Sequence, residues 1–190
     1  PIKKVTITQD GATFTSAVGA NSFDVFARPL SVTKSSSLGY SRTETTAYHD
    51  NLAKWVLGQV ASVTCSAPAA CAGQVMSKTD YDPTTALPLR SYVFGKLQSE
   101  NTYYSGTDAT QVGTLASQKD GNGKVTAYSG WVRGVPQSIK FADTSTISTV
   151  VDGNGWVRSV ADESGPASIV KYDYDGMGRL KTIDYPDGDT

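Results

Sequence analysis

Short runs of alternating apolar and polar residues, separated by glycine-containing turns, make up most of the sequence. Residues 5–8 (Val-Thr-Ile-Thr) alternate with a period of two, Asp10-Gly11 follows, and the alternation resumes at residues 12–15. A period of two is typical of a half-buried β-strand, and Asp-Gly between two such runs favours a tight hairpin turn. The pattern therefore predicts a β-hairpin near the start of the chain.

The same pattern predicts extended segments along the rest of the chain. They cover residues 23–33 (two strands separated at Pro29), 42–48, 54–64, 74–78, 90–97, 101–105, 124–128, 137–141, 146–151, 156–160, 169–174 and 179–183. Residues 35–37 are all serine, and residues 65–73 are rich in alanine with proline and glycine. Both are predicted to be connecting loops, because these residue types favour turns and irregular backbone.

The composition favours an all-β fold. Val, Ile, Thr, Tyr, Phe and Trp together make up 64 of the 190 residues, and these types suit the pleated surface of a sheet. The 15 Asp, 18 Gly and 8 Pro residues supply turns, whereas straight-chain helix formers such as Glu (3 residues) and Leu (9 residues) are scarce. We expect consecutive antiparallel β-hairpins that form a long, curved sheet. A hydrophobic content of 38% is enough to support a collapsed core.

The charge balance excludes some classes of partner. The net charge is −1 and the pI is near 5.8, whereas a nucleic-acid-binding surface needs a clear basic excess. No run of 18 apolar residues is present, so no transmembrane helix is predicted. The chain begins Pro-Ile-Lys-Lys without an apolar leader, and we expect it to be part of a longer protein.

Three copies of the tetrapeptide Asp-Gly-x-Gly begin at Asp120, Asp152 and Asp175, and a short alternating run follows each. The dipeptides Asp-Gly and Asn-Gly adopt the positive φ angles that tight hairpin turns require. One hairpin cannot bury its apolar face alone, so neighbouring hairpins have to stack. The repeat therefore predicts stacked hairpins, and the unequal spacings of 32 and 23 residues indicate insertions between them.

The last of these units is the most specific motif in the chain. Residues 171–188 closely resemble the YD repeat of the RHS protein family, whose motif is Tyr-x-Tyr-Asp-x-x-Gly-Arg-Leu, then a strand, then Pro-Asp-Gly. The matching positions are Tyr172, Tyr174, Asp175, Gly178, Arg179, Leu180, Pro186 and Gly188. Residues 1–74 contain no clear copy. We therefore divide the chain into a β-rich N-terminal segment (1–74), degenerate or not repeated, and a YD-repeat hairpin array (75–190) that is truncated at its C-terminus.

The resemblance implies a function as well as a fold. RHS and YD-repeat proteins are large bacterial polypeptides whose repeats resemble a β-hairpin ribbon wound into a hollow shell. In toxin-complex and polymorphic-toxin members, the shell encloses a C-terminal toxin. By this resemblance the chain would be a structural, non-catalytic segment of such a shell, secreted or located at the bacterial surface. The implied partners are other YD repeats of the parent chain and an encapsulated toxin domain.

Cys65 and Cys71, the two cysteines of the chain, bracket the sequence Ser-Ala-Pro-Ala-Ala. A disulfide between them would fit the extracytoplasmic location that the resemblance implies, and two unpaired thiols are the alternative. Because the bond would close a short loop, we expect it to contribute little to global stability.

A binding function is a second hypothesis for the aromatic residues. Trp131, Trp156, Tyr103 and Tyr104 are candidates for a glycan-binding strip, as in an extracellular adhesin or a carbohydrate-binding module. Packing within the sheet is the favoured alternative, because aromatic side chains bury large areas. Rows of exposed rings would support glycan binding, whereas unfolding on substitution of Trp131 and Trp156 would support packing.

The sequence indicates no catalytic residue, no metal site and no cofactor. His49 and Asp50 are neighbours, so in a strand their side chains would point to opposite faces and would not form a catalytic pair. The Asp-Gly-x-Gly turns lack the ligand spacing of an EF-hand loop, and neither a Gly-x-Ser-x-Gly elbow nor a phosphate-binding loop is present. We therefore do not expect an enzyme.

Overall fold

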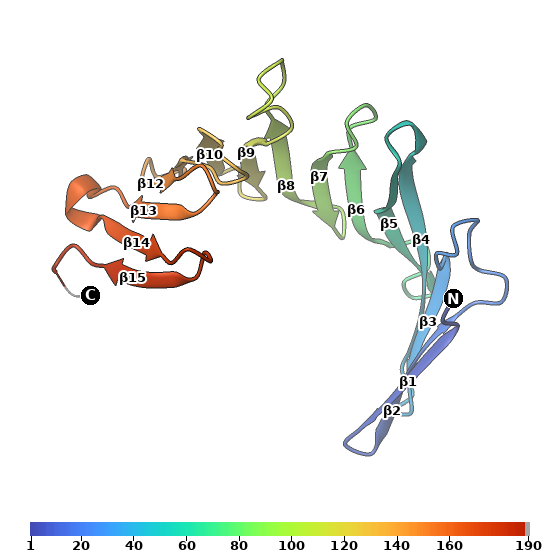
Figure 1. Ribbon diagram of the computed structural model, residues 1–190. Coiled ribbons are helices and arrows are strands. Elements are labelled where there is room, and N and C mark those ends of the chain that lie inside the picture. Colours follow the sequence, from blue (N-terminus) through green and yellow to red (C-terminus); the bar gives the residue numbers. More distant parts are fainter. Residues whose placement is uncertain (189–190) are drawn as a thin grey trace. The chain divides into compact units, whose positions relative to one another are not determined.

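The computed structural model of the chain describes residues 1–188 as an all-β protein (Figure 1). The chain divides into two compact units, Pro1–Gln98 and Ser99–Thr190. Within each unit, each strand pairs antiparallel with its neighbours in the sequence. The predicted fold of consecutive antiparallel β-hairpins is therefore confirmed.

The first unit is built from long hairpins. Its strands are β1 (Lys4–Gln9), β2 (Ala12–Val18), β3 (Ser31–Ser36), β4 (Ser41–Asn51), β5 (Val56–Ala67), β6 (Val75–Tyr81) and β7 (Pro88–Val93), and the 3₁₀ turn η1 (Leu52–Lys54) connects β4 to β5. The β1–β2 hairpin closes at Asp10 and Gly11, whose φ angles are +49° and +76°. Positive φ at both central residues is the geometry that Asp-Gly favours, so this predicted hairpin is confirmed.

The second unit has shorter strands. The strand β8 (Lys96–Tyr103) crosses the boundary, and then follow β9 (Leu115–Asp120), β10 (Val125–Ser129), β11 (Ser138–Lys140), β12 (Thr146–Val151), β13 (Val157–Ala161), the 3₁₀ turn η2 (Gly165–Ser168), β14 (Val170–Tyr174) and β15 (Leu180–Asp184). The three Asp-Gly-x-Gly turns join β9 to β10, β12 to β13 and β14 to β15, as the repeat predicted.

Some predicted strand limits are wrong because local turns override the alternation. Residues 23–33 do not form two strands: an isolated bridge joins Phe23 to Pro29, and β3 begins at Ser31. The segment 90–97 is not one strand, since a turn at Phe94 and Gly95, with φ angles of +48° and +76°, divides β7 from β8. The positive φ angles at these two residues reverse the chain, whereas the alternation of apolar and polar residues had predicted one continuous strand.

Other boundaries are wrong by a few residues. The predicted loop 35–37 is shorter, because its first two serines belong to β3. The predicted strand 54–64 begins at Val56 because Lys54 lies in η1, and Cys65, placed in a loop by the sequence, lies within β5. Residues 115–120, for which no strand was predicted, form β9.

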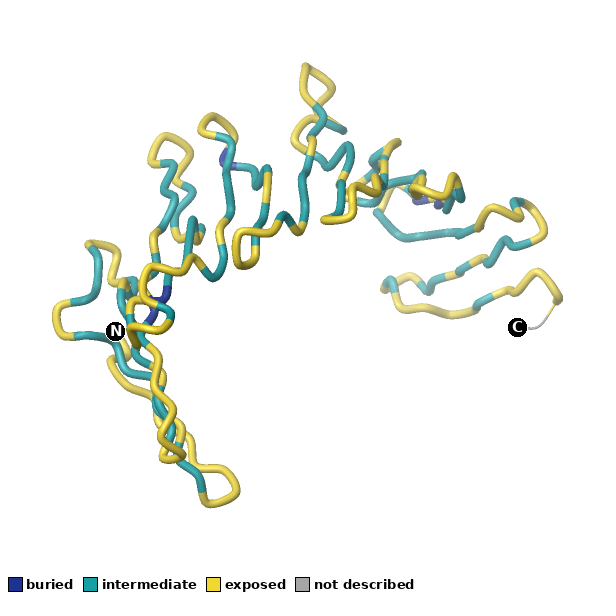
Figure 2. The backbone as a smooth tube through the Cα atoms, turned by 180° about the vertical axis from the view of Figure 1, so that it is seen from behind, coloured by how far each residue is buried: buried dark blue, intermediate teal, exposed yellow. Residues whose placement is uncertain are grey.

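Little of the chain is fully buried (Figure 2). Among the described residues, only Cys65, Ala86, Val151, Glu44 and Thr149 are buried. Helix in this part of the chain is limited to the two 3₁₀ turns, so no long helix covers the strands. The expected collapsed core is therefore thin, and the order of each unit depends on turns and on contacts between neighbouring strands.

Candidate functional site: aspartate-clamped turns and the contacts between hairpins

The turn between β14 and β15 is held by a single carboxylate. The backbone N–H groups of Met177 and Arg179 donate to Oδ1 of Asp175 over 2.9 and 3.0 Å, and Nε of Arg179 donates to Oδ2 over 2.7 Å. These hydrogen bonds hold the pKa of Asp175 below its ordinary value, and the bond from the Arg179 backbone N–H has the largest effect. Nη2 of Arg179 also forms an ion pair with Oδ2 of Asp175 at 2.7 Å.

The turn between β12 and β13 repeats this arrangement. Oδ1 of Asp152 accepts the backbone N–H groups of Asn154 and Trp156 over 2.9 and 3.1 Å, and Oδ2 accepts Nε of Arg158 over 2.8 Å. Burial raises the pKa of Asp152, but the hydrogen bonds from Trp156, Arg158 and Asn154 outweigh it and leave the pKa below the ordinary value. The carboxylate therefore stays ionised in its structural role.

A common backbone turn underlies these side-chain bonds. The backbone N–H of the first residue of the turn donates to the carbonyl of the fifth residue. The backbone N–H of the fourth residue donates to the carbonyl of the first residue. The turns that begin at Asp24, Ser36, Asp120, Phe141, Asp152 and Asp175 share this pattern. It is a three-residue hairpin loop that ends on a residue with positive φ. Asp in first position strengthens it, because the carboxylate satisfies two further N–H groups.

Gly178 lets the β14–β15 turn meet the preceding hairpin. Its φ angle is +79°, and a Cβ atom placed on it would lie 2.8 Å from Cζ2 of Trp156. The Trp156 ring also packs against Tyr174, with ring centroids 5.4 Å apart. The hydroxyl of Tyr174 in turn donates to the backbone carbonyl of Val157 over 3.0 Å. Trp156 and Tyr174 therefore form a contact that joins successive hairpins.

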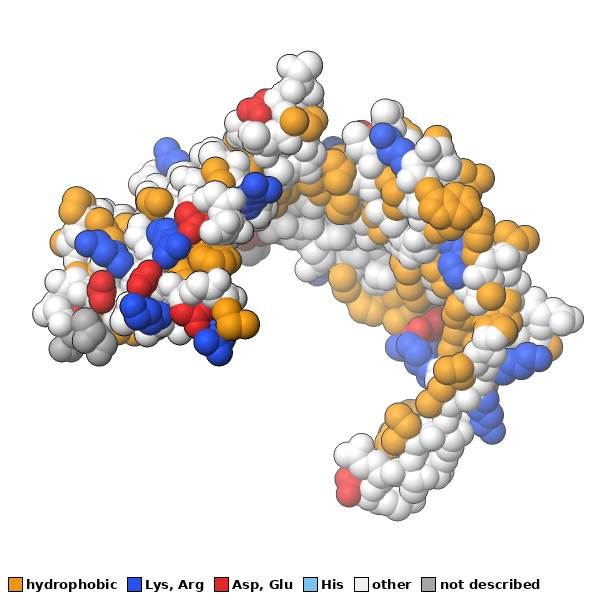
Figure 3. Space-filling model, in the orientation of Figure 1, with side chains coloured by type: hydrophobic (Ala, Val, Ile, Leu, Met, Phe, Trp, Pro, Cys, Tyr) orange, Lys and Arg blue, Asp and Glu red, His pale blue; other side chains and the backbone are white. Residues whose placement is uncertain are grey.

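Arg158 extends this contact with its charge. Its guanidinium lies 5.5 Å from the Trp156 ring centroid and 5.3 Å from that of Tyr174. It pairs with Asp152 at 2.7 Å and with Asp173 at 3.3 Å, and Asp173 lies 3.9 Å from Nζ of Lys181. Charged side chains of both signs accordingly gather over this part of the second unit (Figure 3). Because Lys181 and Asp173 are largely exposed, the charge network itself adds little stability.

The sequence of this region matches a known family. Residues 151–190 match the family described as RHS Repeat. This part of the chain is therefore similar to an RHS repeat. The match includes the turns at Asp152 and Asp175 and the eight positions of the sequence motif, so the predicted resemblance is confirmed. No curated protein matches the sequence.

The fold beyond the RHS repeat is similar to that of larger solved structures. In the crystal structure of TcdB2-TccC3-Cdc42 the similarity has a TM-score of 0.53 at 14% identity, over 89% of this chain and 10% of that chain. The crystal structure of TcdB2-TccC3 without its hypervariable C-terminal region gives 0.42 at 16% identity, over 89% and 10%. The Photorhabdus luminescens Tc holotoxin pore gives 0.29 at 13% identity, over 90% and 11%. Only the first value supports a shared fold, and the chain spans about a tenth of these proteins.

A turn like those of the RHS repeat also lies at residues 24–28, where the sequence showed no clear copy. Oδ1 of Asp24 accepts the backbone N–H groups of Phe26 and Arg28, both over 2.9 Å, and Oδ2 accepts Nε of Arg28 over 2.6 Å. Ala27, with a φ angle of +60°, takes the place that Gly178 has in the RHS repeat. Asp followed four residues later by Arg is the signal that this turn shares with the turn at Asp175, and the absence of glycine hid it in the sequence.

Arg28 also ties this turn to the next strands. Its two terminal nitrogens donate to both carboxylate oxygens of Asp50 over 2.6 and 2.7 Å, and its guanidinium lies 4.2 Å from the ring centroid of Tyr48. The side-chain bonds from Arg28 lower the pKa of Asp50 to about 2. The bidentate geometry is the strong form of an arginine–carboxylate pair.

The remaining motif residues of the RHS repeat are less enclosed. Tyr172 lies opposite Ile183 and is half-buried, whereas Leu180 and Pro186 are exposed. Gly188 has a φ angle of +88° and donates its N–H to the carbonyl of Tyr185 over 3.0 Å, so a turn follows β15.

The four aromatic residues proposed for glycan binding are all half-buried. Nε1 of Trp131 donates to the Leu115 carbonyl over 2.9 Å, and the Tyr104 hydroxyl donates to the Tyr128 carbonyl over 2.8 Å. Tyr103 accepts from the side chain of Asn101 over 3.4 Å. Together with the Trp156 contacts, these bonds support the packing interpretation, and glycan binding stays an untested prediction.

His49 and the cysteines occupy structural positions in the first unit. The His49 ring stacks on Tyr81 with centroids 5.0 Å apart, while the Asp50 carboxylate is taken by Arg28. Cys65 and Cys71 form a disulfide bond, and Cys65 has no exposed surface. Residues 1–188 contain no cluster of three or more His, Cys, Asp or Glu side chains placed to bind a metal, and none of their helices is long and apolar enough to cross a membrane.

Proposed function

We propose that the chain is a structural, non-catalytic wall segment of a bacterial RHS/YD-repeat protein. In this role it would contribute to a β-shell that encloses or presents a C-terminal toxin, and the parent protein would be secreted or held at the bacterial surface. Its partners would be the neighbouring repeats of the parent chain and the enclosed toxin domain.

The observation that carries the proposal is the recurrence of one clamped turn along the chain. Asp24, Asp152 and Asp175 each bind two backbone N–H groups and an arginine four or six residues later. These carboxylates and arginines satisfy one another, so they offer no unpaired acid or base for chemistry. The Trp156–Gly178–Tyr174 contact joins one hairpin to the next. Such a device serves the stacking of hairpins and not catalysis.

The repeat organisation extends, in this proposal, into the N-terminal segment. The turn at Asp24 and Arg28 has the same hydrogen bonds as the RHS repeat, with alanine in place of glycine. Residues 1–74 would then be a diverged part of the same ribbon. The similarity to the TcdB2-TccC3-Cdc42 structure over 89% of the chain supports this fold-level continuity.

Protection of a C-terminal domain in the parent protein tests the proposal. The coding sequence on both sides of the chain is determined, and the longer protein is expressed with a C-terminal epitope and treated with protease. Gly178→Ala, which pushes Trp156, is compared with Gly123→Ala, a turn glycine whose added Cβ would meet nothing within 4 Å. We expect slow loss of the epitope in the native protein and faster loss in Gly178→Ala than in Gly123→Ala.

Two results would contradict the wall function. One is flanking sequence without further repeats. The other is an epitope that is cleaved in the folded parent as fast as in the urea-unfolded parent. If the epitope is protected and neither substitution speeds its loss, the parent protein still encloses its C-terminal domain. The contact between Gly178 and Trp156 would then not be needed for that protection.

A further inference from the structure

The tetrapeptide Asp-Gly-Asn-Gly occurs twice in the second unit, at residues 120–123 and 152–155. Both copies form the same three-residue hairpin loop, in which the N–H of the last glycine donates to the carbonyl of the aspartate over 3.0 Å. Asn122 and Asn154 are both exposed. The two turns therefore share one local sequence and one set of backbone hydrogen bonds, and a difference between them comes from the rest of the fold.

The dipeptide Asn-Gly is chemically reactive, and it occurs at no other place in the sequence. The glycine nitrogen, once it has lost its proton, attacks the side-chain amide carbon of the asparagine. A succinimide ring forms, and the leaving amide nitrogen takes up a proton and departs as ammonia. Water then opens the ring at either carbonyl group and gives aspartate or isoaspartate. Glycine favours the attack because it has no side chain to hinder the approach.

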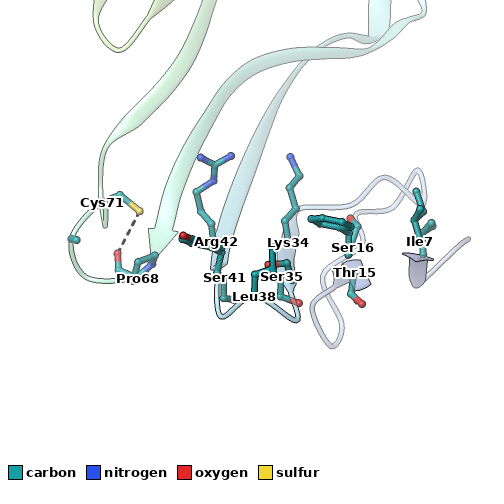
Figure 4. Close-up of a pocket in the computed structure, with 15 residues that line it drawn as sticks. Ile7, Thr15, Ser16, Lys34, Ser35, Leu38, Ser41, Arg42, Pro68 and Cys71 are labelled. Carbon is teal, nitrogen blue, oxygen red and sulfur yellow. Dashed lines mark hydrogen bonds between the residues drawn. The ribbon is translucent and has the colours of Figure 1, made fainter. Parts of the chain in front are cut away.

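Other turns of this type carry different residues at the place of the two asparagines. That place is the third residue of the turn, directly before the residue with positive φ. Leu38 holds it in the turn between β3 and β4 (Figure 4), and Met177 holds it in the turn between β14 and β15. Neither side chain has a carbonyl group for the next nitrogen to attack. Asparagine deamidation in turns of this type is therefore restricted to Asn122 and Asn154.

The closed turn holds each asparagine away from the reactive geometry. In this kind of loop the asparagine is the second central residue of a type I turn, where ψ is about 0°. That ψ angle places Cβ out of the plane of the Asn–Gly peptide bond, whereas the succinimide ring needs Cβ in that plane. The glycine N–H is also bonded to the aspartate carbonyl. Each turn has to open before its asparagine reacts, so the reaction rate depends on how often the turn opens.

Two arginines hold the turn between β12 and β13 closed. Nε of Arg158 donates to Oδ2 of Asp152 over 2.8 Å. Nε of Arg133 donates to the carbonyl of Gly153 over 3.2 Å. A Cβ atom placed on Gly155 would lie 3.1 Å from Cβ of Arg133, so the arginine also packs directly against the turn. Opening of this turn requires the loss of contacts with both arginines.

The turn between β9 and β10 is clamped by its own backbone. The N–H groups of Asn122 and Lys124 donate to Oδ1 of Asp120, both over 2.9 Å. The residues four and six positions after Asp120 are lysine and threonine, whereas the other clamped turns have arginine at one of these places. Within the described part of the chain, nothing lies within 4 Å of a Cβ atom placed on Gly123. This turn is therefore easier to open than the turn at Asp152.

We propose that Asn122 is a site of spontaneous deamidation, and that the contacts of Arg133 and Arg158 protect Asn154 from the same reaction. One charge-assisted hydrogen bond changes the population of an open state about tenfold. In the isoaspartate product, the main chain gains one CH₂ group within the loop that joins β9 to β10, and we expect the pairing of these strands to loosen. The proposal rests on the contacts of the two turns and does not depend on the wall function.

Peptide mapping by mass spectrometry tests the proposal on the 190-residue chain. The chain is kept at mildly alkaline pH, and the conversion of amide to acid is followed over time at each asparagine. We expect Asn122 to react about tenfold faster than Asn154 in the folded chain. In urea, the two rates should agree within about twofold, because the tetrapeptides are the same and the tertiary contacts are gone.

Arg133→Ala tests the cause of the protection. The substitution removes one set of contacts from the turn at Asp152, so deamidation at Asn154 should become about fivefold faster, while the rate at Asn122 stays the same. Lys171→Ala changes an exposed basic side chain of β14 in the same unit, and as a matched control it should alter neither rate. Circular dichroism confirms that both variants remain folded.

The possible results decide the proposal. Equal rates at the two asparagines in the folded chain overturn it, as does a faster reaction at Asn154. A difference that persists unchanged in urea also overturns it, because the fold would then not be the cause. An unchanged rate at Asn154 in Arg133→Ala contradicts the protective role of that arginine. A difference that urea abolishes and that Arg133→Ala reduces supports the proposal.

Discussion

The contact between Gly178 and Trp156 makes a sharp prediction about stability. Replacing Gly178 by Ala adds one methyl group where φ is +79° and where the new Cβ would lie 2.8 Å from the Trp156 ring. Two separate penalties result, one from the backbone conformation and one from the ring. Gly123 has the same place in the Asp120 turn and a φ angle of +82°, but nothing lies within 4 Å of its added Cβ. Gly123→Ala therefore carries the backbone penalty alone.

The magnitudes can be worked out from these geometries. An L-residue in the left-handed region costs about 1–2 kcal/mol relative to glycine. Forcing a rigid ring away from an added methyl group costs about 1–3 kcal/mol more, because the ring has to leave its packing position against Tyr174. We expect Gly123→Ala to lower the free energy of unfolding by about 1–2 kcal/mol and Gly178→Ala by about 2–5 kcal/mol.

The assay is urea unfolding followed by tryptophan fluorescence, with a double-mutant cycle. In the background of Trp156→Ala, the ring is gone and Gly178→Ala should cost no more than Gly123→Ala does. Amide hydrogen exchange then locates the effect, which we expect in β13, β14 and β15. The reasoning is refuted if Gly178→Ala and Gly123→Ala cost the same, or if removing Trp156 leaves the cost of Gly178→Ala unchanged.

Three further predictions concern other contacts. Because the pKa of Asp50 is lowered to about 2, its ion pair with Arg28 stabilises the fold above the ordinary aspartate pKa, and this stabilisation is lost as the pH falls from about 4 towards 2. Asp50→Asn should therefore flatten the curve of unfolding free energy against pH between about pH 4 and 2. An unchanged curve would contradict this prediction. Reduction of the Cys65–Cys71 disulfide should lower the free energy of unfolding by no more than about 2 kcal/mol, because the loop that it closes is short. Amide hydrogen exchange should increase only around residues 65–74. Loss of exchange protection throughout the first unit would argue against a local role. Trp131→Phe removes the donor to the Leu115 carbonyl and should lower the free energy of unfolding by about 1 kcal/mol; on a glycan array, a signal from the unmodified chain that Trp131→Phe abolishes without loss of stability would favour the binding hypothesis over packing.

The candidate site was predictable in part. The Asp-Gly-x-Gly turns and the motif from Tyr172 to Gly188 could be predicted from the sequence, because positive φ angles and alternating strands constrain the residue type at single positions. The clamp at Asp24 and Arg28 was not found, because an alanine holds the positive φ angle there and the alternation of residues 23–33 suggested strands. Tertiary bonds from Arg28 to Asp50 stabilise that turn, and they join residues far apart in the sequence.

Local sequence determined the class of fold, the order of the hairpins and most of their turns. These features depend on φ preferences and on alternation with a period of two, which act over a few residues. Only the tertiary structure decided which arginine meets which carboxylate, why Gly178 has to remain small under Trp156, and which aromatic rings pack between neighbouring hairpins. Those outcomes depend on side chains that meet across neighbouring strands and hairpins. The distances between those side chains are set by strand register and packing, which cannot be predicted from any single stretch of sequence.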